Sequence, residues 1–182
     1  MGGFEVNAFV VHAPGGDLIV DAGAEPEKIL AHLKKPVAAI LITHGHRDHV
    51  SVLDAVRRET EAPVYAHRAD AEGVGIVNYE PLEDGQDLEI ADENFKVLHT
   101  PGHSPGSVTF VFGRDQIVGD LILPGSVGRT DISGASWEEI EVSIRKVMPF
   151  WDGATRLFVG HGPVLYAMEE LEGNPYLPLG VL

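Results

Sequence analysis

The segment from Ala39 to Val50 constrains this chain more than any other. It opens with an apolar run, 39–42, of the kind that forms a buried β-strand. Three histidines and one aspartate follow within six residues: His44, His46, Asp48 and His49. Imidazole and carboxylate groups are the ligands of zinc, iron and manganese sites, and so many of them together are unfavourable without a cation. The segment therefore predicts a metal site at a strand end; the alternative is a polar loop with incidental histidines.

Length and composition indicate a globular protein with a substantial core. The chain has 182 residues, 44% of them hydrophobic and 23% charged, which predicts a single domain over 1–182. Cysteine is absent, so disulfides, thiolate zinc sites and a cysteine nucleophile are excluded. The formal net charge of -15 disfavours nucleic acids and anionic membranes as partners. We expect a small-molecule substrate instead.

The start of the chain carries no targeting signal that we can identify. The segment 1–5 has no basic region, and no stretch approaches the roughly 18–20 apolar residues that span a bilayer. We therefore expect a cytoplasmic protein. The sequence does not decide the oligomeric state.

Hydrophobic patterning predicts strands and helices interspersed along the chain. The expected strands are 6–11, 17–20, 37–42, 64–66, 88–90, 95–98, 108–112, 116–118 and 157–159. The expected helices are 25–33, 50–59, one capped by Ser136 that runs to about Val147, and 165–172. Residues 68–86 follow no clear pattern, and a short lid or connector is our expectation there. This order predicts an α/β (α+β) fold with two mixed sheets covered by helices.

Three more strands end in residues that can bind metal. His103 lies in the Pro- and Gly-rich loop 100–107, Asp120 follows the strand before it, and His161 stands between two glycines. The seven residues divide into two sets of three and a shared carboxylate. His44, His46 and His103 would hold one ion, Asp48, His49 and His161 a second, with Asp120 bridging them. Asp21 either orients these ligands or caps a turn, and His12, His32, His67 and His99 lack such a loop context.

These motifs give the chain a family resemblance. Residues 43–49 match the T-H-x-H-x-D-H signature of the metallo-β-lactamase superfamily, and His103, Gly119-Asp120 and Gly160-His161-Gly162 match its later motifs in order. The resemblance implies an αβ/βα four-layer sandwich with the metals at the sheet edges. Within the superfamily, the segments 102–107, 128–131 and 174–177 look most like compact bacterial type II glyoxalase (hydroxyacylglutathione hydrolase)-like hydrolases.

The resemblance implies a metal-dependent hydrolase with two divalent ions, zinc in the first place and iron or manganese as alternatives. A metal-bound hydroxide would attack an ester or thioester carbonyl, as in a glyoxalase II-like thioester hydrolase. Asp48 and Asp120 would be the catalytic residues that handle the proton. Arg129 would bind a substrate carboxylate, or else pair structurally with Asp131.

Other functions fit the same motifs. Persulfide dioxygenases resemble this family and use one iron, which His44, His103 and Asp120 would hold here. A lactone hydrolase and a metal-holding interaction protein without activity are further alternatives. Larger type II glyoxalases have a C-terminal helical domain that contacts glutathione, whereas few residues follow His161 here, so we do not expect their glutathione recognition.

Overall fold

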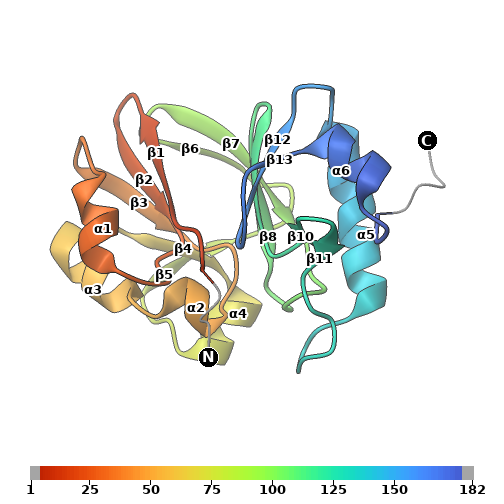
Figure 1. Ribbon diagram of the computed structural model, residues 1–182. Coiled ribbons are helices and arrows are strands. Elements are labelled where there is room, and N and C mark those ends of the chain that lie inside the picture. Colours follow the sequence, from red (N-terminus) through yellow and green to blue (C-terminus); the bar gives the residue numbers. More distant parts are fainter. Residues whose placement is uncertain (1–4, 178–182) are drawn as a thin grey trace.

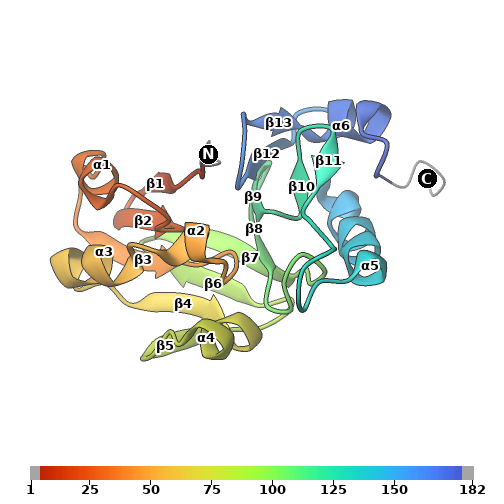
Figure 2. The same cartoon turned by 60° about the horizontal axis from the view of Figure 1, so that its bottom comes forward.

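Two β-sheets pack face to face between two outer layers of helices in the computed structural model, which describes residues 5–177 (Figure 1). Helices α1 and α3 cover the outer face of one sheet, and α5 and α6 lie beyond the other sheet, on the opposite side of the molecule (Figure 2). Both sheets contain parallel and antiparallel pairs. The predicted four-layer sandwich with two mixed sheets is confirmed.

The first sheet has the strand order β1-β2-β3-β4-β5. Its strands are β1 (Phe9–Ala13), β2 (Gly16–Val20), β3 (Val37–Leu41), β4 (Val64–His67) and β5 (Tyr79–Leu82). The first two strands form an antiparallel hairpin, and the other pairs are parallel. Because β2, β3 and β4 run in the same direction, their carboxyl ends meet at one edge of the sheet.

The second sheet has the order β13-β12-β9-β8-β7-β6. Its strands are β6 (Asp87–Ile90), β7 (Glu93–His99), β8 (Val108–Phe112), β9 (Asp115–Gly119), β12 (Arg156–Val159) and β13 (Leu165–Tyr166). The parallel pair β9–β12 brings the ends of these two strands together. A separate small hairpin is formed by β10 (Ile122–Leu123) and β11 (Ser126–Val127).

The helices flank this double sheet. They are α1 (Pro26–Ala31), α2 (Arg47–Val50), α3 (Leu53–Thr60), α4 (Arg68–Val74), α5 (Trp137–Val147) and α6 (Ala167–Gly173), with a short 3-10 helix at Met148–Phe150. The predicted cap of α5 is present, since the Ser136 hydroxyl accepts a hydrogen bond from the Glu139 amide at 3.2 Å. None of the helices in residues 5–177 has the length and apolar character that a membrane crossing would need.

Alternation along the strands builds the core on both sides of each sheet. Leu18 and Val20 in β2 point into the cluster between the sheets, which also contains Phe110. Ile19, between them in sequence, packs with Val56 of α3 in the cluster under the outer helices. Each of these side chains is essentially inaccessible to solvent, and burial of one such side chain contributes about 1.5–3 kcal/mol. The core therefore holds the sheet edge, and the loops on it, in a fixed position.

Residues 68–86 are not a lid or connector, and that expectation is wrong. Helix α4 begins at Arg68 and ends where Gly75 adopts a left-handed conformation, with φ of 77°. Strand β5 then adds to the edge of the first sheet. The sequence pattern did not predict this strand, because Glu80 and Pro81 are consecutive exposed residues that break the alternation of polar and apolar side chains. A strand at the edge of a sheet tolerates such residues.

Two further element boundaries differ from expectation. The helix expected over 50–59 is divided into α2, which begins earlier at Arg47, and α3. The helix expected over 165–172 starts with the two residues of strand β13. Between α2 and α3 the Val52 amide bonds to the Ala22 carbonyl at 3.0 Å, and β13 pairs with β12. A helical pattern alone does not predict such tertiary contacts.

Candidate metal centre

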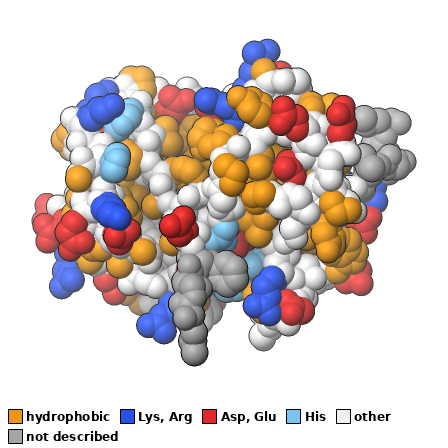
Figure 3. Space-filling model, viewed as in Figure 1, with side chains coloured by type: hydrophobic (Ala, Val, Ile, Leu, Met, Phe, Trp, Pro, Cys, Tyr) orange, Lys and Arg blue, Asp and Glu red, His pale blue; other side chains and the backbone are white. Residues whose placement is uncertain are grey.

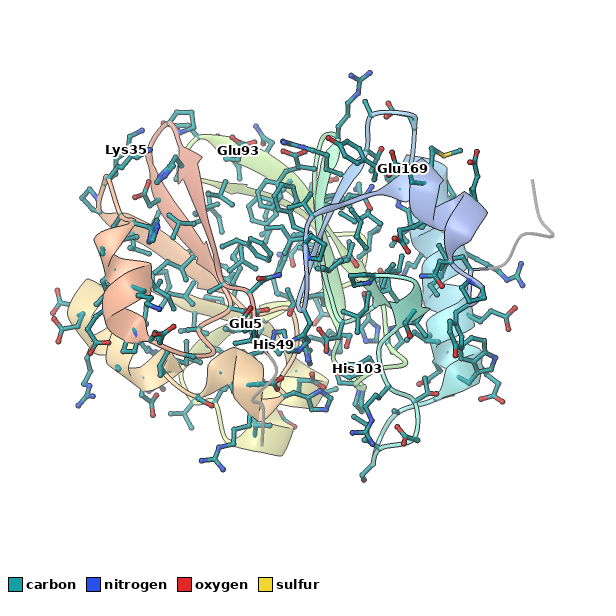
Figure 4. All side chains as sticks on the ribbon, in the orientation of Figure 1. Glu5, Lys35, His49, Glu93, His103 and Glu169 are labelled. Carbon is teal, nitrogen blue, oxygen red and sulfur yellow. The ribbon has the colours of Figure 1, made fainter. Side chains whose placement is uncertain are left out.

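All seven predicted ligands meet at one place, where strands of both sheets end. The segment 44–49 follows β3, His103 lies between β7 and β8, Asp120 follows β9, and His161 follows β12. In Figure 4 the labelled His49 and His103 lie close together in the lower middle, between the two halves of the molecule. Within 4.8 Å of one another lie ligand atoms of three groups: His44, His46 and His103; His44, His49 and Asp120; and Asp48, His49 and His161.

The first group is built around a buried histidine. His44 is 1% exposed, and its ring lies 4.9 Å from the rings of both His46 and His103, centroid to centroid. The Nδ1 atom of His46 is 2.8 Å from Nε2 of His103. Both nitrogens therefore point toward one small volume.

The group of Asp48, His49 and His161 is built around another buried histidine. His49 is fully buried, and its ring lies 5.3 Å from that of His161. The Nε2 atom of His161 is 3.2 Å from Oδ2 of Asp48. These are the two sets of three that the sequence predicts for separate ions.

Asp120 lies between the two groups. Its Oδ1 is 3.5 Å from Nε2 of His49, and its Oδ2 is 3.4 Å from Nε2 of His103 and 3.5 Å from Nε2 of His161. One carboxylate thus faces imidazoles of both sets. This is the position that a bridging ligand requires.

A hydrogen bond at the far nitrogen fixes most of the histidine rings. The Nδ1 atoms of His44, His49, His103 and His161 bond respectively to Thr43 Oγ1 at 3.1 Å, Asp21 Oδ2 at 2.8 Å, the Arg129 carbonyl at 3.0 Å and the Glu5 carbonyl at 2.7 Å. These bonds leave Nε2 of each ring directed at the centre. His46 is the exception, because it presents Nδ1 there.

Asp21 is the residue that organises this outer layer. Its carboxylate accepts hydrogen bonds from the Thr43 amide at 2.8 Å and hydroxyl at 2.7 Å, besides its contact with His49. It is buried and has a positive φ of 61°. Of the two roles that the sequence allowed, the orientation of ligands is the one that these contacts serve.

Three polar atoms at the centre are buried without any hydrogen-bond partner among the described residues: Nε2 of His44, Nε2 of His49 and Oδ1 of Asp120. Buried polar groups left unpaired in this way cost about 1–3 kcal/mol each. A cation among them would satisfy all three. The residues therefore fit a metal site, and their nitrogen and oxygen donors suit zinc, iron and manganese alike.

The pKa values of the histidines at the centre are shifted in opposite directions. Burial, together with the neighbouring His49 and His103, holds the pKa of His44 well below its usual value. Burial also lowers the pKa of His103. Burial acts against the charged form of His49 too, but the carboxylates of Asp120 and Asp21 outweigh it and raise that pKa to about 10. At neutral pH the first two rings are therefore neutral and have a free lone pair for a metal, whereas His49 has to release a proton when an ion binds.

The centre opens into a cavity of about 420 Å³. Its wall consists of His46, Arg47, Asp48, His103, Asp120, Leu123, Arg129, Ile132 and His161. Figure 3 shows histidine side chains at the surface in the hollow between the two halves of the molecule. Metal-binding and apolar side chains thus line the same space, as in an enzyme pocket.

Two arginines stand at this cavity. Arg129 makes the pair with Asp131 that the sequence offered as an alternative, with contacts of 2.9 and 3.0 Å between exposed side chains. Its binding of a substrate carboxylate stays a prediction. Arg47, which we did not single out because it lies inside the histidine motif, is exposed and forms no ion pair among residues 5–177.

The remaining histidines lie elsewhere. His12 bonds to Asp17 at 2.9 Å, His32 bonds to the Lys28 carbonyl on α1, and the rings of His67 and His99 stack 4.0 Å apart. The three ligand groups contain none of them. They are exposed or partly buried residues.

Comparison with known proteins agrees with this geometry. Residues 1–161 match the family described as the Metallo-beta-lactamase superfamily. The chain is 35% identical to the Probable metallo-hydrolase YqgX of Bacillus subtilis, over 97% of this chain and 94% of that protein. It is 27% identical to the Hydroxyacylglutathione hydrolase GloC of Haemophilus influenzae, over 87% of this chain and 86% of that protein.

Solved structures are similar over nearly the whole length. BLEG-1 B3 metallo-beta-lactamase has a TM-score of 0.88 at 31% identity, covering 97% of this chain and 96% of its own. TTHA1623 in a di-iron-bound form has a TM-score of 0.86 at 35% identity, covering 97% and 98%. ETHE1 from Myxococcus xanthus, with a TM-score of 0.80 at 24% identity, covering 94% and 78%, is similar in fold. By sequence, fold and ligand arrangement, this chain belongs to the metallo-beta-lactamase superfamily.

Proposed function

We propose that this protein is a metal-dependent hydrolase that cleaves an ester or thioester, most like the glyoxalase II-like thioester hydrolases. The observation that carries the proposal is the arrangement of Asp120 between two histidine-containing groups, with three buried ligand atoms left without partners. A mononuclear site would need only one of these groups. The name of the Haemophilus relative, a hydroxyacylglutathione hydrolase, supports a thioester substrate.

The bound ions would supply an acidic water molecule near neutral pH and a Lewis acid for the carbonyl oxygen. His44, His46 and His103 would hold one ion, and Asp48, His49 and His161 the other, with Asp120 shared. We propose zinc as the bound metal, and the di-iron form of TTHA1623 supports iron as the alternative.

The chain's carboxylates would manage the proton. Asp48 is half exposed at the cavity wall, where Nε2 of His161 lies 3.2 Å from its Oδ2. A carboxylate in that position can accept a proton from the attacking water and pass it on as the carbon–sulfur or carbon–oxygen bond breaks. A thiolate needs little help from a general acid, so a thioester suits this site better than an amide does.

The cavity wall supports a substrate with an apolar and an anionic part. Leu123 and Ile132 offer the apolar surface. Arg47 and Arg129 would attract a carboxylate, in a protein whose net charge of -15 otherwise repels anions. Of the two, Arg129 already shares its charge with Asp131.

The decisive experiment pairs metal analysis with two assays on the same protein. Reconstituted protein should bind two equivalents and hydrolyse S-lactoylglutathione or a simpler thioester. Asp48→Asn and His161→Ala should lose the second equivalent and most of the hydrolysis, whereas His32→Ala, at the C-terminal end of α1, should lose neither.

The alternatives appear as outcomes of that experiment. Oxygen uptake with glutathione persulfide that survives Asp48→Asn, without hydrolysis in the wild type, would mean a persulfide dioxygenase with iron at His44, His103 and Asp120. Hydrolysis of lactones in preference to thioesters would mean that the protein is a lactone hydrolase. Stable binding of metal with no turnover of any of these compounds would favour an interaction protein.

A further inference from the structure

A further buried carboxylate, Asp70, lies behind the metal centre and is not one of its ligands. Asp70 is in the first turn of α4, in the segment that the sequence did not resolve, and is 7% exposed. Its Oδ2 accepts hydrogen bonds from the Gly45 amide at 2.7 Å and the Ser104 hydroxyl at 2.6 Å. Its Oδ1 accepts one from the Gly106 amide at 2.6 Å.

These three donors belong to the two loops that carry the first group of ligands. Gly45 stands between His44 and His46, and Ser104 follows His103 directly. The loops are far apart in sequence and come from different sheets, so the carboxylate is a physical link between them. Among the described residues, Asp70 makes no hydrogen bond to the segment 48–49 or to His161.

The backbone of both loops is fitted to this carboxylate. A Cβ atom at position 106 would lie 2.6 Å from both the amide nitrogen and Cγ of Asp70, and one at position 45 would lie 3.1 Å from its Cβ. Only glycine permits the approach at Gly106, because real Cβ atoms do not come within 3.0 Å of other heavy atoms. The close contact therefore depends on residues in three separate segments of the chain: Gly45, Asp70 and Gly106.

The energetics point to positioning rather than to charge pairing. Asp70 forms no ion pair with a lysine, arginine or histidine among the described residues. All three donors are neutral, and hydrogen bonds to a charged acceptor are shorter and about twice as strong as neutral ones. Replacement of the carboxylate would leave buried N–H groups unpaired. Asp70 therefore holds the two ligand loops in a fixed position relative to each other.

We propose that Asp70 is a positioning residue that sets His103 against the His44–His46 loop and so determines the affinity of that ligand group for its ion. The inference rests on the metal site in the proposed function. It concerns only one of the two ligand groups. Metal affinity, rather than turnover, is thus the quantity that Asp70 controls.

The chain offers a matched control in Asp17. This carboxylate is also fully buried and accepts hydrogen bonds from the amides of Lys34 at 2.6 Å and Lys35 at 3.0 Å, with His12 at 2.9 Å. It lies at the start of β2, at the opposite end of the strand from Asp21. Asp17→Asn should therefore destabilise the fold by the same mechanism without touching a ligand loop.

The experiment compares Asp70→Asn, Ser104→Ala and Asp17→Asn with the wild type, each as metal-free protein titrated with Co²⁺ against a competing chelator. The Co²⁺ absorption spectrum reports the ligand geometry. Asp70→Asn should weaken one of the two equivalents by about 10–100-fold and change its spectrum, as loss of a group behind a ligand does elsewhere. The other equivalent should stay near its wild-type affinity. Ser104→Ala should show a smaller loss at the same equivalent.

Thermal unfolding of the metal-free proteins completes the test. Asp17→Asn should lower the melting temperature while both Co²⁺ affinities and spectra stay as in the wild type. Wild-type affinities and spectrum in Asp70→Asn, or equal weakening of both equivalents, would overturn the positioning role. Wild-type protein that binds Co²⁺ but hydrolyses nothing would refute the proposed function and leave this inference standing, whereas failure to bind Co²⁺ at all would refute both.

Discussion

Gly160→Ala should damage the metal centre although the residue is not a ligand. A Cβ atom there would lie 2.0 Å from Oδ1 of Asp120 and 2.6 Å from Cε1 of His49. An unstrained carbon–oxygen contact is about 3.3–3.6 Å, so the carboxylate has to move by about 1 Å or more. His49 cannot turn aside, because it is fully buried and its Nδ1 is held by Asp21 at 2.8 Å.

The size of the effect follows from these distances. Metal–ligand distances tolerate deviations of only about 0.2 Å, and Asp120 is the residue shared by both ligand groups, so both equivalents should bind more weakly. Overpacking of a core by one methyl group costs about 1–3 kcal/mol. For a chain of this length that lowers the melting temperature by about 2–12 °C, so the variant still folds.

Gly153→Ala is the matched control, because a Cβ atom at position 153 meets nothing within 4 Å. Circular dichroism of metal-free protein would give the melting temperatures, and titration calorimetry with zinc would give the affinities. Gly153→Ala should behave as the wild type in both. Two equivalents bound by Gly160→Ala with unchanged affinity would refute the argument, since Asp120 could not then need its observed position.

Three further outcomes follow from the site and from the fold. Asp120→Ala should lower kcat/KM for hydrolysis by more than the roughly 10–100-fold typical of residues behind a ligand, and His12→Ala should not; equal activities at matched metal loading would contradict the bridging role. Arg47→Ala should raise KM for a carboxylated substrate about tenfold, as loss of a charge-assisted hydrogen bond predicts, and should leave KM for the methyl ester of that substrate unchanged. Arg58→Ala on α3 is the control. An equal rise in KM for the ester would exclude recognition of charge. Burial raises the pKa of Asp17, but the hydrogen bonds it accepts outweigh burial and bring its pKa below the usual 3.8. Its stabilisation is therefore present above about pH 3.8 and lost as the pH falls through the lower folded value; the free energy of unfolding of Asp17→Asn should be less sensitive to acid there.

The sequence predicted which residues meet at this centre because each lies where local patterns are strongest. A buried strand that ends in a glycine- or proline-containing loop is recognisable from a few residues, as at His103 and His161. The parallel pairing of β9 with β12 then brings Asp120 and His161 together without further information. The grouping into two sets needed only chain order and the number of ligand residues.

The outer contacts could not be predicted in this way. Asp70 looks like any acidic residue in the first turn of a helix, and only the folded loops show that Gly45 and Gly106 close around it. Arg47 and Arg129 are the same residue type, but Arg129 forms an ion pair with Asp131, so its charge is partly neutralised. These properties depend on side-chain packing between distant segments, which no local pattern contains.

Each ligand group draws on both sheets, and this connects metal binding to the packing of the whole molecule. His44 and His46 come from the first sheet and His103 from the second; His49 comes from the first and His161 from the second. An ion that binds either group therefore bridges the two halves, in addition to the apolar cluster between them. Binding to the folded state alone adds stability that grows with concentration, by about 2.7 kcal/mol at one hundred times Kd. By the same linkage, a substitution that shifts the two sheets relative to each other should weaken metal binding even where it touches no ligand, because the ion binds only with both halves in place.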